Sequence, residues 1–166
     1  FASDGSSNQG YLFHLNQSEL STIIRNIDVE ILSNKIKTIF NELTFEEEDI
    51  DVNYWVIAPG RGAKIWEECY NLGIIAIGWD DLGDFNNYQT REDIADKLRE
   101  INESNSSMKN DSLACYEFAY AMKPGDIVIP KKGNSTYLGY GIVTSDYIYD
   151  DSRESYHHIR KVDWKV

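Results

Sequence analysis

The spacing of hydrophobic residues changes near residue 50. Between residues 18 and 43 apolar side chains recur every three or four positions, which predicts two helices, the second capped by Asp28. Residues 1–10 are polar and indicate a flexible leader, and the acidic run 44–53 (TFEEEDIDVN) indicates a solvated linker. We therefore predict a leader, a helical segment and a linker in residues 1–50, and one globular domain in residues 51–166.

Beyond residue 50, short apolar runs alternate with helical patterns. The strand-like runs lie at 54–58, 74–79, 127–131, 137–145 and 156–166, and the helical patterns lie at 63–72, 90–101 and 112–122. Strand, helix, strand, helices and then consecutive strands predict an α+β fold, flanked by helices, whose mixed sheet curls into a small barrel. The alternation within the first strand and the one-sided spacing within the first helix place Trp55 and Trp66 in the core.

Charge and cysteine content narrow the function classes. The 166 residues carry a formal net charge of −12, which argues against nucleic acid because phosphate binding normally needs a basic surface. Basic residues do gather locally, however, so a basic rim on an acidic body remains open. Cys69 and Cys115 both fall in helical patterns, which predicts two buried free thiols in a reducing cytoplasm.

Targeting signals are not evident in the sequence. The longest apolar run, 74–77, is too short for a membrane span, and the polar N-terminus predicts no signal peptide. The sequence does not begin with methionine, which indicates a piece of a longer protein. We expect a cytoplasmic protein with no membrane partner.

No set of residues in the sequence forms a convincing catalytic site. Asp80, Asp81 and Asp84 could hold a divalent cation in a nuclease, but a solvated turn is the simpler interpretation of three aspartates after a strand. His157 and His158 point to opposite faces of a strand, so they are not expected to share one metal or one substrate. We predict no catalytic residue, no metal and no cofactor.

Aromatic residues at the strand ends are more informative. Trp79 follows an apolar run and Gly78, which places the indole at the mouth of a strand, and Tyr147 and Tyr149 are two apart and therefore share a face. A flat ligand between Trp79 and one of these tyrosines is physically sensible. Stacking of one base on an aromatic ring contributes about 1–3 kcal/mol, which is comparable with the cost of extracting a base from a duplex. Such a pocket must therefore add hydrogen bonds or a close fit.

Four motifs in order give the chain a family resemblance. They are G-W-D-x-x-G-D from Gly78, P-G-D-x-V from Pro124, G-x-G-x-V-x-x-D-Y from Gly139, and H-x-R-K-V-x-W from His158. Over residues 53–166 this series resembles the EVE/YTH group of PUA-like domains. It is most similar to the domain at the N-terminal side of McrB-type modification-dependent restriction GTPases.

The resemblance implies a curled mixed barrel that holds a modified base in an aromatic cage. Trp79 would form one wall, and Tyr147 or Tyr149 the other. Backbone groups of residues 58–60 would face the base edge, and Asp80, or less favourably Asp81, would accept a hydrogen bond from it. The residues so implicated are Ala58, Pro59 and Gly60 at the pocket floor, with Arg61, Lys64, Lys131 and Lys132 as phosphate contacts.

The function implied by this resemblance is recognition without catalysis. We expect a reader of methylated or hydroxymethylated cytosine, or of N6-methyladenine, in DNA, with the base flipped into the cage. Its partners would be modified DNA and the AAA+ GTPase and nuclease subunits of a restriction system. A protein-binding or small-ligand module on the same fold, which the net charge favours, and a metal nuclease are the alternatives.

Overall fold

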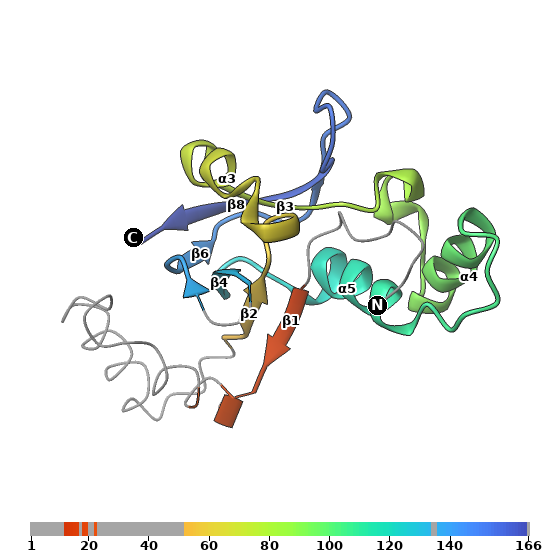
Figure 1. The fold of residues 1–166 in the computed structure, drawn as a ribbon, viewed down its shortest axis with the longest axis horizontal. Helices are drawn as coiled ribbons and strands as arrows, with labels where there is room; N and C mark the ends of the chain where they lie inside the picture. Colours follow the sequence, from red (N-terminus) through yellow and green to blue (C-terminus); the bar gives the residue numbers. More distant parts are fainter. Residues whose placement is uncertain (1–11, 17, 20–21, 23–51, 134–135, 166) are drawn as a thin grey trace.

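The computed structural model describes residues 12–16, 18–19, 22, 52–133 and 136–165 (Figure 1). Most of the helical pattern predicted between residues 18 and 43 lies outside the described residues. The predicted leader and most of the predicted linker lie outside them too.

Eight strands form one curled mixed sheet in the described part of the chain. They are β1 (Leu12–Leu15), β2 (Tyr54–Ile57), β3 (Ile74–Ile77), β4 (Ile127–Lys132), β5 (Thr136–Tyr137), β6 (Gly141–Val143), β7 (Ile148–Tyr149) and β8 (His158–Trp164). The strand order is β1-β2-β4-β6-β8-β3, with β5 added to β4 and β7 added to β8. Only β2 and β4 run parallel among these pairs. The predicted α+β class with a curled mixed sheet is therefore confirmed.

Helices flank this sheet. The α-helices described are α3 (Trp66–Leu72), α4 (Arg91–Ile101) and α5 (Lys109–Tyr116), and a π-helix, η4 (Glu117–Ala121), continues α5. Short 3₁₀ turns are η1 (Arg61–Ala63), η2 (Asp80–Leu82) and η3 (Phe85–Asn87). Figure 1 shows α3 beside β3 and β8, whereas α4 and α5 lie together, away from α3.

The main core fills the space between the sheet and helices α4 and α5. Strand side chains such as Trp55 and Ile77 meet Leu98, Cys115 and Phe118 there, all 4% exposed or less. A second cluster joins α3 to β3 and β8 through Ile65, Cys69 and Ile74, among others. The predictions that Trp55 lies in the core and that both cysteines are buried free thiols are confirmed, while Trp66 is only half-buried.

Two polar residues of the recognised motifs hold the fold together. Asp126 is fully buried and accepts hydrogen bonds from the Trp55 indole at 2.8 Å and from the Lys123 backbone at 3.0 Å. Arg160 is also buried, and its guanidinium donates to the backbone carbonyls of Phe118 and Ala119, in the π-helix. Buried charged groups need such partners, so both residues are structural.

The structure corrects several predicted elements. Strand β1 lies within residues 1–50, where only leader, helix and linker were expected, and it pairs antiparallel with β2. The strand expected at 137–145 is divided into β5 and β6, and β7 was not predicted. Gly141 allows β6 to lie close against β8 side chains, since a Cβ there would lie 2.3 Å from Val162 Cγ1 on β8.

Candidate functional site

The chain leaves β3 through a strained residue. Trp79 has φ 66° and ψ 34°, a left-handed conformation that is rare for a bulky side chain and costs about 1–3 kcal/mol. Such strain persists only where the surrounding structure enforces it, and it concentrates at functional sites.

A second aromatic residue in the same conformation lies next to this exit. Tyr156, which directly precedes the His157-His158 pair, has φ 58°. The Asp80 carboxylate joins the two segments, because Oδ2 accepts from the Tyr156 backbone N–H at 2.9 Å and Oδ1 accepts from the His157 N–H at 2.8 Å. One aspartate thus fixes the β7–β8 hairpin against the end of β3.

The end of β2 reaches the same place. A Cβ at Gly60, where φ is 70°, would lie 3.0 Å from the Tyr156 hydroxyl, and the Lys64 amine lies 5.5 Å from the centre of the Tyr156 ring. The ends of β2 and β3 therefore meet at the β7–β8 hairpin. We call this meeting point the strand-end cluster: Gly60, Lys64, Trp79, Asp80, Tyr147, Tyr149, Tyr156, His157 and His158.

Aromatic rings fill the inner side of the strand-end cluster. The fully buried His158 ring stacks on Phe85 with 3.6 Å between ring centres and 9° between planes. Its Nδ1 lies 2.8 Å from the Tyr147 hydroxyl, which itself accepts from the Phe85 backbone N–H. The Tyr147 and Tyr149 rings both lie against His158, at 6.0 and 5.4 Å, as expected for side chains on one face.

The hydrogen bonds around His158 assign its proton. Nε2 lies 3.3 Å from the Trp79 carbonyl, which can only accept, so the proton sits on Nε2 and Nδ1 accepts from the Tyr147 hydroxyl. Burial lowers the pKa of His158 to about 4, so the imidazole is neutral near pH 7. Burial also raises the pKa of Tyr147, which keeps the phenol protonated.

The prediction that the Trp79 indole borders an open hollow is wrong for this structure. Trp79 is only 4% exposed and belongs to the main core cluster with Phe85 and Leu82. The Tyr147 hydroxyl is likewise engaged inside the protein. Trp79 and Tyr147, the two predicted walls, both lie near the strand ends, but other side chains of the core pack around the Trp79 indole.

Two further sets of predicted contacts make hydrogen bonds within the protein. Each Asp80 oxygen, which was expected to accept from a base, accepts one backbone N–H group. Among residues 58–60, which were expected to offer backbone groups, the Pro59 and Gly60 carbonyls accept from Ile65 and Ala63 in the turn that follows. Asp81 is exposed and Ala58 half-buried.

Sequence reasoning missed the contributions of Tyr156 and His157. His157 is half-buried, and its ring lies 5.8 Å from Tyr149, perpendicular to it. Its Nδ1 is shielded from solvent and has no hydrogen-bond partner among the described residues, with Asp80 Oδ1 3.8 Å away. The His158 ring also approaches Tyr149, at 5.4 Å, but it is fully buried and both of its nitrogens have partners inside the protein. No local sequence signal reveals the left-handed backbone of Tyr156.

The four predicted phosphate contacts lie at one end of the sheet. Ile57 pairs with Pro130, so the chain beyond β2 runs beside Lys131 and Lys132, and η1, which begins at Arg61, contacts β4. Lys131 is half-buried, and the other three cations are exposed. A cationic border beside the strand-end cluster thus exists despite the acidic total.

Neither a metal site nor a membrane segment was found in the described residues. No group of three or more His, Cys, Asp or Glu side chains there is placed to hold a metal ion, and Asp80, Asp81 and Asp84 do not form one. No helix within the described ranges is long and apolar enough to cross a bilayer.

Comparison with known proteins gives a family without an assigned role. No curated protein and no solved structure matches the chain. A family model described as a domain of unknown function (DUF8426) matches residues 55–166, which is more than half of the chain. The chain therefore belongs to this family, DUF8426.

Proposed function

We propose that this domain is a non-catalytic reader of modified bases in DNA and serves as the targeting module of a McrB-like restriction protein. The observation that carries the proposal is the convergence of two strand ends on an aromatic hairpin, where Trp79 and Tyr156 both have left-handed conformations and Asp80 bonds the backbone of Tyr156 and His157. The motif series that resembles the EVE/YTH domains runs through these same segments.

The finer fold assignment is part of this proposal. We infer that the curled mixed sheet is the barrel of a PUA-like domain of the EVE/YTH group. The parallel β2–β4 pair inside an otherwise antiparallel sheet, and the helix between β2 and β3, support this inference. AAA+ GTPase and nuclease partners are proposed on the same resemblance.

Binding requires the strand-end cluster to open. Tyr149 is half-buried at the outer side of His158, so displacement of Tyr149 and the β7–β8 hairpin would admit a base beside Trp79. Stacking supplies about 1–3 kcal/mol, which only offsets base extrusion. His157 Nδ1 is a polar atom without a hydrogen-bond partner among the described residues, and it can bond the base edge beside Asp80.

Binding to matched oligonucleotides tests the proposal. Short duplexes with one 5-methylcytosine, 5-hydroxymethylcytosine or N6-methyladenine are compared with the unmodified duplex by fluorescence anisotropy. We expect one modification to bind more tightly, and Tyr149→Ala to weaken that binding by about tenfold or more. Trp79→Ala is a poor test, because truncating a buried tryptophan costs about 3–5 kcal/mol of stability on its own.

Tyr70→Ala provides the control, since Tyr70 is 45% exposed on α3, outside the strand-end cluster. Both variants are first checked by thermal unfolding. Equal affinity for all four duplexes, in protein that melts cooperatively, would refute base reading.

A second candidate function is binding of a protein or a small ligand by the same cluster. The net charge of −12 is the observation that favours it. It predicts no preference among the duplexes, together with loss of partner binding in Tyr149→Ala and not in Tyr70→Ala.

A further inference from the structure

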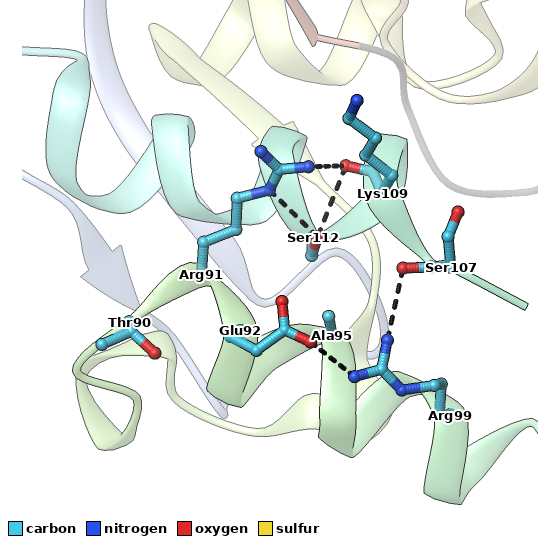
Figure 2. Close-up of a pocket in the computed structure, with 8 residues that line it drawn as sticks. All are labelled: Thr90, Arg91, Glu92, Ala95, Arg99, Ser107, Lys109 and Ser112. Atoms are coloured by element: carbon cyan, nitrogen blue, oxygen red, sulfur yellow. Dashed lines mark hydrogen bonds and ion pairs between the residues drawn. The ribbon is translucent and has the colours of Figure 1, made fainter. Parts of the chain in front are cut away.

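Helices α4 and α5 border an open pocket that the proposed function does not use. The pocket has a volume of about 560 Å³ (Figure 2). Three cationic side chains line it, Arg91, Arg99 and Lys109, against one carboxylate, Glu92. This balance is notable in a chain whose acidic residues outnumber its basic ones by 28 to 16.

Arg91 is held in place by hydrogen bonds to neutral groups. Its Nε donates to Ser112 Oγ at 3.3 Å, and Nη2 donates to the Lys109 carbonyl at 2.7 Å. Among the described residues no carboxylate forms an ion pair with Arg91. Burial raises the pKa of Glu117, and the positive charge of Arg91 acts to lower it. A guanidinium has five N–H donors in a planar fork, so an oriented face of Arg91 remains for an anion.

The start of α5 borders the same pocket through Lys109, and its first turn also carries Asp111. The α4 start is satisfied by a capping box in which Thr90 and Asp93 exchange hydrogen bonds, whereas no side chain caps the start of α5 after Met108. The first N–H groups of a helix point outward from its amino end and favour negative charge. Arg91 and Lys109 lie at this end, as Figure 2 shows.

Arg99 and Glu92 form the opposite side of the pocket. Arg99 donates to the Ser107 carbonyl at 3.4 Å and pairs with Glu92 at 2.6 Å, and it also contacts Asp96. The Glu92 side chain is 74% exposed, so it can turn toward solvent at little cost.

We propose that the pocket between α4 and α5 binds a phosphate group, with Arg91 and the amino end of α5 as its main ligands. Arginine forks and helix amino ends are the two protein groups best suited to a tetrahedral oxyanion. The phosphate is either a phosphodiester of nucleic acid or the phosphate of a free nucleotide. The inference does not depend on base reading, because it uses different residues.

Titration with inorganic phosphate, pyrophosphate, adenosine monophosphate and a short unmodified duplex tests the site. Amide and arginine Nε–H resonances are followed by NMR in the complete chain. We expect saturable shifts in residues 107–112 and at Arg91, and binding about tenfold or more weaker in Arg91→Gln. Lys97→Gln is the control, because it removes one positive charge from the exposed side of the same helix.

The relative affinities of these probes distinguish a phosphodiester from a free nucleotide, and two results would contradict the proposal. Stronger binding of the duplex than of the free phosphates identifies a phosphodiester contact, and the reverse identifies a nucleotide. Absence of saturation with every probe, or equal weakening in Arg91→Gln and Lys97→Gln, would overturn the proposal. If Arg91→Gln does not fold, Arg91→Lys keeps the charge, loses the fork, and should still weaken binding where Lys97→Gln does not.

Discussion

Asp80 is the residue on which the strand-end cluster depends. Its carboxylate accepts two backbone N–H groups from the β7–β8 hairpin, and it follows Trp79 directly. The left-handed conformations of Trp79 and Tyr156 cost free energy, and hydrogen bonds to a charged acceptor help to offset that cost. Asp80, which was expected to contact a ligand, therefore also shapes the site.

Substitution of Asp80 should lower stability while its neighbour tolerates the same change. Asp80→Asn removes the charge and leaves one of the two backbone N–H groups facing the amide NH2, which cannot accept a hydrogen bond, so we expect the free energy of unfolding to fall by about 1–3 kcal/mol. Asp81→Asn, at an exposed position, should change it by less than about 0.5 kcal/mol. Urea unfolding of both variants measures the difference, and equal effects would contradict the assigned role.

His158 should make stability depend on pH. Burial lowers the pKa of His158 from 6.5 to about 4, so the unfolded chain binds a proton more readily than the folded one. The contribution of neutral His158 is fully present above pH 6.5 and is lost as the pH falls toward 4. The loss amounts to roughly 3 kcal/mol across this window.

Urea unfolding at several pH values between 7 and 4 checks this expectation. His158→Gln should be less stable at pH 7 but should show a smaller decrease of stability on acidification. A decrease of the same size in both proteins would mean that other groups, such as the carboxylates, carry the pH dependence.

At the scale of elements, the sequence predicted the helices and strands that are determined by residues close together in the chain. The start of α4 follows from the Thr90 and Asp93 capping box, and β2 and β3 follow from apolar runs of four residues. Strands β5 and β7 have two residues each and exist because a longer strand offers them partners. Patterns within such short segments carry too little information to predict them.

The candidate site was partly predictable for the same reason. The shared face of Tyr147 and Tyr149 is a property of an extended backbone, and both rings do lie against His158. The direction of the Trp79 indole depends instead on its left-handed backbone. The adjacent Asp80 bonds Tyr156, 76 residues further along the chain, and no local pattern contains that contact.

For the whole molecule, the structure places the beginning of the folded unit before the family match. The matched region starts at residue 55, yet β1, at Leu12–Leu15, forms the edge of the sheet beside β2. The His14 ring lies 4.9 Å from the Trp55 ring, and Leu12 belongs to the main core cluster. These contacts indicate that β1 belongs to the same cooperative unit as residues 52–165.

Two neighbouring substitutions in β1 test that unity. Leu12 is 5% exposed and Phe13 is 51% exposed, because successive side chains of a strand face opposite sides. Leu12→Ala should lower the free energy of unfolding by about 2–5 kcal/mol, whereas Phe13→Ala should change it by about 1 kcal/mol or less. Urea unfolding followed by tryptophan fluorescence reports on the four tryptophans, of which Trp55 lies on the adjacent strand. Similar stability of Leu12→Ala and the unsubstituted chain would show that β1 is an accessory strand, and the folded unit would then begin with β2.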